Sequence, residues 1–538
     1  MGITSAIGNA MSGLRATSRS AEIVARNIAN AGVEGYAAKS LALGHETHGG
    51  QPGGVRVDGV LRAGDPLLTA ARRSDEAEAG RLSAEADTLR RIADLALDPA
   101  GGDSLQSRYL AFENALRALA DTPESPAMQR AAADTARGLA VKLNKLSTEA
   151  RRIRMDADRE IQRQVETVNR ALRRIEGLNK DIQSAAAAGR DSSALEDERQ
   201  RQIDLVNGVV PIKSAQPLPN GGMHILAQGG QSLMNGTTAH AFSFETGGQV
   251  TGSNDLGGVT HLGRTTVEPA RIGLGGGSLE AAFRARDLHA RGFSEQLDAM
   301  ARDLVERFQD VPGFEAPGGG SALGLFVDRA RGADARFPTV ADSFTPAPAT
   351  QAEWTAKVAE IDAQAAGLAG RIAVNALIDP RQGGDAERLV TGESVFAETS
   401  PPAEPRLTLP SALYAAMREA RDPRAVAMAY DGGDDTVTTD DVYTSPYLGD
   451  ALGLTGAASR VDMVTEWATL LETEAGAAET EASFRRGAAE ALREQELGAQ
   501  AVDTDEEMRR LLQIEKAYAA NARVLQVADQ MLATMLEI

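Results

Sequence analysis

The residues whose spacing could support chemistry are few, and each set has a simpler interpretation. His45 and His48 stand three positions apart, a spacing at which two imidazoles can share a metal ion, but they lack the His-Glu-x-x-His pattern of zinc proteases. Glycines border the pair on both sides, so we interpret it as an exposed loop. The acidic run from Asp431 to Asp435 lacks the spaced ligands and closing glutamate of a calcium loop. We expect that run to form a solvated turn.

Motifs of the common enzyme classes are absent from the sequence. It contains no phosphate-binding Gly-x-x-x-x-Gly-Lys-Ser/Thr, no dinucleotide-binding Gly-x-Gly-x-x-Gly and no Gly-x-Ser-x-Gly nucleophile elbow. The absence of cysteine excludes disulfides, thiolate metal sites and cysteine nucleophiles. We therefore predict no catalytic residues, no cofactor and no bound metal.

The overall composition narrows the class of protein further. The 538 residues suggest roughly three or four domains. A formal net charge of -20 argues against binding to nucleic acid or to an anionic membrane surface. Only 4% of the residues are aromatic, which is typical of proteins built from long helices. No apolar stretch is long enough to insert into a membrane, and the first residues lack the basic and apolar regions of a cleaved signal peptide.

The two ends of the chain carry the clearest helical pattern. Apolar or small residues recur there at alternating steps of three and four, which predicts a coiled-coil seam on each terminal helix. Thr504 is the predicted N-cap of the second helix. The pattern leaves open whether the two helices only close the fold as a hairpin or also pack against other chains. The predicted seams are Ile3, Ile7, Ala10, Leu14, Thr17, Ala21, Val24, Ile28 and Ala31 at one end, and Leu511, Ile514, Tyr518, Asn521, Leu525, Ala528, Leu532 and Met535 at the other.

Between the ends, helical stripes enclose a short β region. Strands are expected from about 209 to 250, where Asn-Gly pairs mark hairpin turns, and again at 371–377. The arginines between 151 and 163 are interpreted as a solvated helix face. Helices are expected over 79–96, 105–119, 126–187, 278–308, 354–366 and 461–498.

Both ends also resemble proteins of the bacterial flagellum. The segment from Gly13 to Tyr36, with Asn27-Ile28-Ala29-Asn30 inside it, is similar to the N-terminal signature of flagellar rod, hook and hook-associated proteins. The run from Asp505 to Leu532 is similar to their C-terminal signature, although Glu515-Lys516 replaces the usual pair of glutamines. Three interior elements narrow the resemblance to the FlgK family of hook-associated proteins, namely Leu195–Arg199, Gly230–Met234 and Gly276–Ala281.

The resemblance implies a mainly α fold with a smaller β portion, in which the chain runs outward and returns so that both termini lie innermost. The terminal helices form a coiled-coil pair, and a long-helix bundle with β-hairpins forms the middle domain. By the same resemblance, the helix 461–498 packs on the helix 126–187. The implied domains are an N-terminal arm 1–36, a middle domain from 37–325 and 371–502, a reduced outer insertion at 326–370, and a C-terminal arm 503–538.

The resemblance also implies a function. The protein would be a structural subunit of the junction between flagellar hook and filament, outside the cell, and exported without a cleaved signal peptide. Its partners would be other copies of itself in a ring or tube, the hook protein, the second junction protein and an export chaperone on the C-terminal arm. One alternative is another axial protein of hook or rod type, and the element Leu195–Arg199 argues against it. Another is a secreted enzyme, which would need a pair of catalytic carboxylates, and nothing in the sequence singles out such a pair.

The predicted subunit-interface residues lie on the two arms. The asparagines among them either set the register between helices, as polar seam residues do in coiled coils, or form local hydrogen bonds. The predicted interface consists of Ile7, Leu14, Val24, Asn27, Ile28, Asn30, Leu511, Ile514, Tyr518, Asn521, Leu525 and Leu532.

Overall fold

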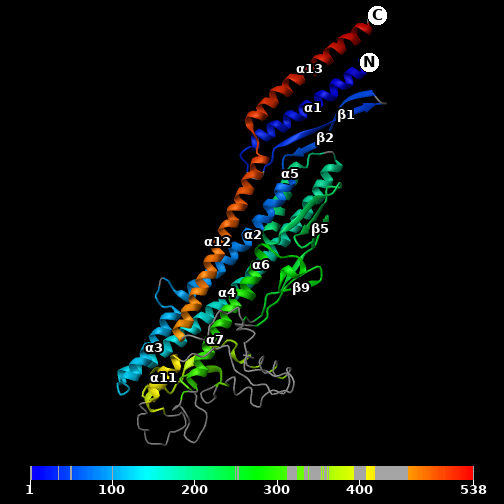
Figure 1. Ribbon diagram of the computed structural model, residues 1–538. Helices are drawn as coiled ribbons and strands as arrows, with labels where there is room; N and C mark the ends of the chain where they lie inside the picture. Colours follow the sequence, from blue (N-terminus) through cyan, green and yellow to red (C-terminus); the bar gives the residue numbers. More distant parts are fainter. Residues whose placement is uncertain are drawn as a thin grey trace, which may run out of the picture.

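The protein is elongated, with its long helices running along one common direction and both termini at the same end (Figure 1). The predicted mainly α fold with a smaller β portion is confirmed. The computed structural model describes residues 3–33, 36–48, 51–99, 101–188, 190–248, 250, 254–309, 311, 324–331, 337–338, 353, 356, 360, 363–392, 408–418 and 459–536.

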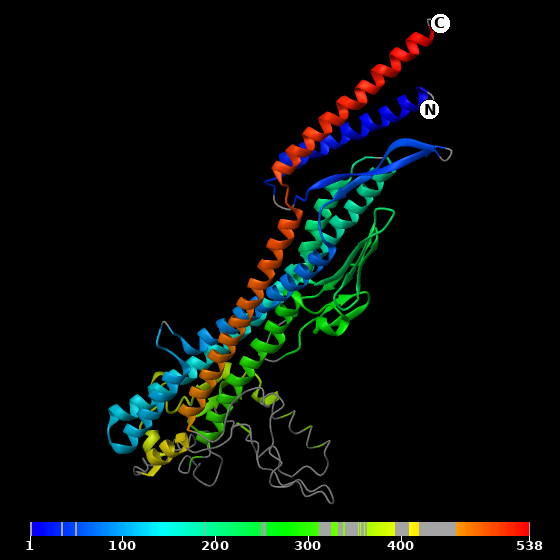
Figure 2. The same cartoon turned by 45° about the horizontal axis from the view of Figure 1, so that its top comes forward.

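The two terminal helices lie side by side at one end of the molecule. These are α1 (Ile3–Asn30) and α13 (Thr504–Leu536), and the predicted pairing of the ends is therefore present within one chain (Figures 1 and 2). The N-cap of α13 is Asp503 rather than the predicted Thr504, because the Asp503 carboxylate accepts hydrogen bonds from the N–H groups of Asp505 and Glu506 at 2.9 and 3.1 Å.

A long β-hairpin, which the sequence analysis missed, lies against α1. Strands β1 (Lys39–His48) and β2 (Gln51–Arg62) are antiparallel, with irregular register at two places. His45 is exposed as expected, but His45 and His48 belong to strand β1 and not to a loop. The bulges interrupt strict alternation of apolar and polar residues, which explains why no strand pattern was visible.

Three helices follow the hairpin, namely α2 (Pro66–Leu97), α3 (Leu105–Asp121) and α4 (Pro126–Ala187), and α3 packs against the first part of α4. Asp65 and Ser104 cap α2 and α3 through side-chain oxygens that accept backbone N–H groups at 2.8 and 3.0 Å. The long helix has the predicted bounds, since Pro126 suits a first helical position and the apolar stripe continues without a break.

The returning helix α12 (Arg460–Gln500) lies along α2 and α3. The prediction that it packs on the helix 126–187 is wrong. Alanines buried at seven-residue intervals, Ala475, Ala482 and Ala489, let α12 approach α2 closely. The apolar side chains of α4 instead pack against other helices and against strands.

The β region forms two small antiparallel sheets beside the upper half of α4 (Figure 1). Gly221 and Gly236 adopt left-handed backbone angles at the turns that Asn-Gly signals predicted. The first sheet contains β3 (Ile212–Pro217), β4 (Met223–Ala227), β5 (Ser232–Gly236) and β6 (Thr238–Ala239), and the second contains β7 (Phe242–Phe244), β8 (Val259–His261) and β9 (Arg264–Thr266).

A second antiparallel partner for α4 comes from the segment after the sheets. A 3-10 turn (Pro269–Ile272) leads into α6 (Gly277–Arg284), a π-helical turn (Ala285–His289) and α7 (Ala290–Gln309). Helix α5 (Ser193–Val209) packs on the upper end of α4.

The apolar core has two parts along this length. The lower part joins α3, the first half of α4, α7 and the start of α12, with Trp467 stacked on Phe293. The upper part joins the second half of α4 with α5, α6 and the first sheet. Both parts depend on α4, which therefore acts as the spine of the body.

Short elements complete the described chain at its lower end. The predicted strand at 371–377 is present as β11, which pairs with β10. Of the predicted helix 354–366, residues 356, 360 and 363–365 are helical and 354–355, 357–359 and 361–362 lie outside the described residues, as do the turn at 431–435 and most of the outer insertion 326–370. The short elements are β10 (Phe326–Asp328), β11 (Ile372–Val374), α10 (Arg388–Thr391), α11 (Thr408–Arg418) and the 3-10 turns Arg329–Arg331, Leu368–Gly370 and Pro380–Gln382.

Candidate assembly interface

Helix α1 is held on two sides, whereas α13 is held on one. Helix α13 packs along α1, and the β1–β2 hairpin packs on another side of α1. The buried side chains of α1 accordingly spread over a broad face that includes Ala10, Ala16, Ile23 and Val24. On α13 the only apolar side chain that is classed as buried, among the described residues, is Ala528.

The two arms approach closely because small residues lie between them. A Cβ atom at Gly13 would stand 2.7 Å from Nδ2 of Asn521, a separation too short for two non-bonded atoms. The sequence analysis did not select Gly13, although it lies in the segment that resembles the flagellar signature. Asn521 therefore faces α1 within the same chain.

Polar contacts fasten α1 to the hairpin. The carboxamide of Asn27, fully buried, donates from Nδ2 to the carbonyl of Lys39 at 2.8 Å, and its Oδ1 accepts the N–H of Lys39 and the hydroxyl of Tyr36 at 3.1 and 2.8 Å. Ser12 Oγ accepts the N–H of Val55 at 3.1 Å. These bonds fix the hairpin along the whole length of α1.

Two of the predicted interface residues are therefore reassigned. Asn27 uses its polar atoms inside one chain, so the local alternative holds for it and the register role does not. Val24 is also covered by the chain itself, at 5% exposure. Asn30 donates to the carbonyl of Arg26 one helical turn earlier and remains partly exposed.

The other predicted residues are at least partly exposed to solvent. Tyr518 and Leu532 are exposed at 51% and 39%. Those that are half-buried between the arms or at their edges are Ile7, Leu14, Ile28, Leu511, Ile514, Asn521 and Leu525.

Exposed apolar side chains occur along the whole of α13, on its outer face and at the edges of its contact with α1. Single exposed apolar residues are normal on a protein surface, but a series along one helix marks an interaction surface. We call this series the α13 stripe. It consists of Met508, Leu512, Tyr518, Val524, Val527, Met531, Leu532 and Met535, each at least 39% exposed.

Buried ion pairs join the arms and hairpin to the body. Asp197, on α5, accepts from Nζ of Lys39 and from Nε of Arg62, both at 2.9 Å. Arg199, two residues on, donates to Oδ1 of Asn179 and to the carbonyl of Gly221 at 3.0 and 3.1 Å. The element Leu195–Arg199 thus fixes the hairpin to the body. Its resemblance to a family motif was the signal that pointed to it.

A second buried network lies where the π-helical turn meets α4. Arg286 donates to Asp158 at 2.6 Å and to Asp287, and Arg154 donates to the carbonyls of Arg286 and Asn254 at 3.1 and 2.8 Å. Both guanidinium groups are fully buried. The interpretation of the arginines between 151 and 163 as a solvated face is therefore wrong for Arg154, and burial lowers the pKa of its guanidinium.

Among the described residues there is no group of three or more histidine or acidic side chains that could hold a metal ion. His261 is stacked on Phe242 and lies next to the carbonyl of Ser232, and burial lowers its pKa. In the described part of the chain, no helix is long and apolar enough to cross a membrane.

Two family models match the chain. Residues 90–318 match the model described as the flagellar hook-associated protein FlgK helical domain. Residues 495–538 match the model described as the flagellar basal body rod FlgEFG protein C-terminal region. The first match covers the body from α2 to the end of α7, and the second covers α13 and the end of α12.

Curated relatives carry a single name. Flagellar hook-associated protein 1 of Escherichia coli (strain K12) is 26% identical over 332 residues, which cover 59% of this chain and 59% of that protein. The protein of the same name from Salmonella typhimurium is 27% identical over 331 residues, with 59% and 58% covered. That from Bacillus subtilis is 25% identical over 221 residues, with 39% and 43% covered. The chain thus spans less than two thirds of the length of these relatives.

Among solved structures, the flagellar hook junction protein FlgK from Burkholderia pseudomallei aligns with a TM-score of 0.41 and 17% identity. The alignment covers 48% of this chain and 46% of that one.

The long-helix body thus matches a domain of flagellar hook-associated proteins, and the C-terminal arm matches a region of flagellar basal body rod proteins. Residues 90–318 carry the FlgK helical domain of flagellar hook-associated proteins.

Proposed function

We propose that this protein is a structural subunit of the hook–filament junction and that it assembles through its terminal arms. The α13 stripe is the observation that carries the proposal. Each large apolar side chain contributes about 1.5–3 kcal/mol when it moves from water into a packed interface. Eight such side chains left exposed along one helix are covered if a neighbouring arm packs on α13.

The arrangement of the arms supports a polymer. Helix α1 is fixed by the hairpin and by α13, so each chain presents a prepared two-helix unit. Neighbouring units can close around an axis and form an inner tube, with the body on the outside. Other copies of the chain are then the first partners, and the flagellar hook protein and the second junction protein are the partners at the two faces of the ring.

The same stripe has a consequence before assembly. An exposed apolar helix in a single chain favours aggregation, so a chaperone that covers α13 until export suits this surface. We propose that the protein works outside the cell on the flagellum. We assign it no catalytic role, because the described residues bring together no constellation that would carry one.

Deletion of residues 505–538 tests the proposal. The full-length and truncated genes are expressed in a flagellated strain that lacks its own hook–filament junction subunit, and swimming and filament attachment are recorded. We expect attached filaments only with the full-length chain. Circular dichroism of the truncated protein should show a folded body, since both parts of the apolar core lie outside α13. Normal filaments on cells carrying the truncated chain would overturn the proposal.

A further inference from the structure

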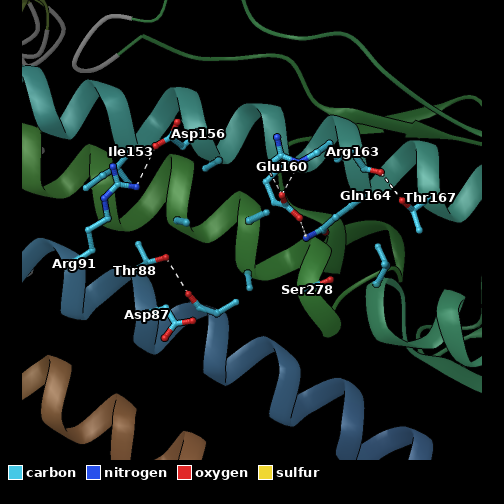
Figure 3. Close-up of a pocket in the computed structure, with 16 residues that line it drawn as sticks. Asp87, Thr88, Arg91, Ile153, Asp156, Glu160, Arg163, Gln164, Thr167 and Ser278 are labelled. Atoms are coloured by element: carbon cyan, nitrogen blue, oxygen red, sulfur yellow. Dashed lines mark hydrogen bonds and ion pairs between the residues drawn. The ribbon is translucent and has the colours of Figure 1, made fainter.

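A groove on the body lies well away from the arms. It has a volume of about 730 Å³ and lies between α2, α4 and α6 (Figure 3). Small side chains line it, among them Ala84, Ala157, Ala281, Ala282 and Ala285. A groove with such a lining has room for a large side chain that its own walls do not supply.

The rim of the groove is charged and more basic on the α4 side. Arg91 reaches across from α2 to Asp156 at 3.1 Å, and Arg163 pairs with Glu160 on α4 (Figure 3). Without the buried Arg154 and Asp158, residues 145–163 have five lysines and arginines against three acids. Among these, Arg152 and Arg159 are more than 60% exposed beside the groove.

One polar atom in the groove lacks a partner. Gln164 lines the groove and donates from Nε2 to Glu160 at 2.9 Å, but its Oε1 is buried and accepts no hydrogen bond. A buried acceptor without a donor costs free energy. Only a hydrogen-bond donor that enters the groove from outside would satisfy it.

A feature of matching shape lies on α12. Phe484 is 69% exposed, the highest value for an aromatic ring in the part of the chain that the structure describes. Next to it on the same helix is Gly487, whose surroundings are open. The segment 461–484 that ends at this ring has six acidic residues and no lysine or arginine, and Arg485 and Arg486 follow the ring. Phe484 is therefore a protruding apolar side chain on an acidic helix.

The protruding ring and the groove stand at the same height along the molecule. Arg486 donates to Ser83 at 3.0 Å and Glu479 pairs with Arg90 at 3.9 Å, which places Phe484 level with residues 84–87 of α2. The ion pair between Arg91 and Asp156 likewise places those residues level with 160–164 of α4. Helix α2 separates α12 from the groove, so the ring does not enter the groove of its own chain.

We propose that the groove between α2, α4 and α6 receives Phe484 and the acidic flank of α12 from a second copy of this chain. Copies rotated about the long axis of the molecule meet at equal heights, so the ring of one copy faces the groove of the next. Because the two surfaces differ, the contact is heterologous and continues around a ring. The acidic flank of α12 then faces the basic side of α4. The inference rests on the proposed function, which supplies the second copy.

Cysteine cross-linking tests the contact directly, because the chain has no cysteine of its own. Phe484→Cys and Gln164→Cys are combined in one full-length chain, assembly is followed by sedimentation, and the assembled fraction is oxidised. We expect a ladder of cross-linked species, and only dimers when the two single variants are mixed. The matched control combines Gln164→Cys with Leu110→Cys, an exposed position on α3 at 47%, and should give no ladder.

The outcomes separate this inference from the proposed function. If the protein assembles but the Phe484→Cys, Gln164→Cys chain gives no more cross-links than the control, the groove does not hold Phe484 and the inference is overturned. If no chain sediments as an assembly under any condition, self-assembly itself fails and both proposals are wrong.

A charge exchange gives a second, independent test. Glu481→Arg should weaken assembly at least about tenfold, because it brings a like charge to the basic side of α4. Adding Arg159→Glu in the same chain should restore most of the loss. Both positions are exposed, so the monomer should keep its circular dichroism spectrum. Equal assembly by all three chains would contradict the proposed orientation of α12.

Discussion

At the residue scale, buried charges fasten segments that are far apart in the sequence. Asp197 joins α5 to the first residue of β1 and to the last residue of β2. Arg286 joins the π-helical turn to Asp158 of α4. Asp298 of α7 accepts the N–H groups of Gly367 and Ala369 at 2.7 and 2.8 Å. Sequence reasoning could not find these pairs, because a charged residue on a helix is usually solvated and its burial depends on what the rest of the chain brings to it.

Asp197→Ala should loosen the hairpin. The change leaves Lys39 buried without its carboxylate, and removing one partner of a buried pair costs about 3–5 kcal/mol. Hydrogen exchange of the β1 and β2 amides should become faster than in the unchanged protein. The control is Asp191→Ala, which removes an exposed pair with Arg26 and should cost less than about 1 kcal/mol. Equal protection of the hairpin in both variants would contradict this assignment.

Asp298 should make the body less stable as the pH rises from about 4 to about 7. Burial raises the pKa of this carboxyl to about 7. In this window the unfolded chain has already lost the proton that the folded chain keeps, so stability falls with rising pH and levels off above about 7. The loss amounts to about 4 kcal/mol, at about 1.4 kcal/mol per pKa unit.

Urea unfolding at several pH values checks the Asp298 prediction. The free energy of unfolding of the unchanged protein, minus that of Asp298→Asn, should decrease across this window. Asp255→Asn, at a carboxylate that is 92% exposed, serves as the control and should leave the pH dependence as it is. Parallel curves for the unchanged protein and Asp298→Asn would show that this carboxyl does not titrate as stated.

At the element scale, the sequence predicted the long helices and missed what holds them together. Ser125-Pro126 and an unbroken apolar stripe were enough to give both ends of α4. The hairpin of β1 and β2 was missed because its bulges break the alternation of residues. The partner of α12 was predicted wrongly, since its alanine face fits any helix that can approach closely, and only the three-dimensional arrangement selects α2.

The candidate interface, too, was predicted only in part. The heptad pattern correctly predicted that the two ends are helices that pair, and it selected Tyr518 and Leu532, which remain exposed. It could not show that the hairpin covers Val24 and Asn27, because that depends on an element the pattern did not reveal.

Gly13→Val should separate the two arms. A side chain at this position meets Asn521, and relieving such overpacking costs about 1–3 kcal/mol. We expect α13 to be cleaved faster by a protease while the body stays resistant. Gly8→Val is the matched control, because it lies on the same helix and a Cβ atom there meets nothing within 4 Å. If both variants are cleaved at the same rate, the close approach at Gly13 does not hold the arms.

At the scale of the whole molecule, the net charge opposes assembly whereas the shape of the chain favours it. The elongated chain places its exposed apolar stripe at one end and the groove on the body, so neighbouring copies can pack side by side along their length. Each copy also carries a formal net charge of -20. Such a charge keeps single chains apart and soluble, and it opposes the packing that the apolar surfaces favour.

Salt should therefore promote assembly of the purified protein. Raising the ionic strength from about 0.01 M to about 0.15 M shortens the screening length from about 30 Å to about 8 Å, which weakens repulsion between whole chains while apolar contacts along the α13 stripe remain. Sedimentation should show a larger assembled fraction at the higher salt concentration. The chain lacking residues 505–538 should remain monomeric at both concentrations, which separates assembly through the arms from salting out. A smaller assembled fraction at higher salt would mean that attraction between opposite charges, rather than burial of the stripe, holds the copies together.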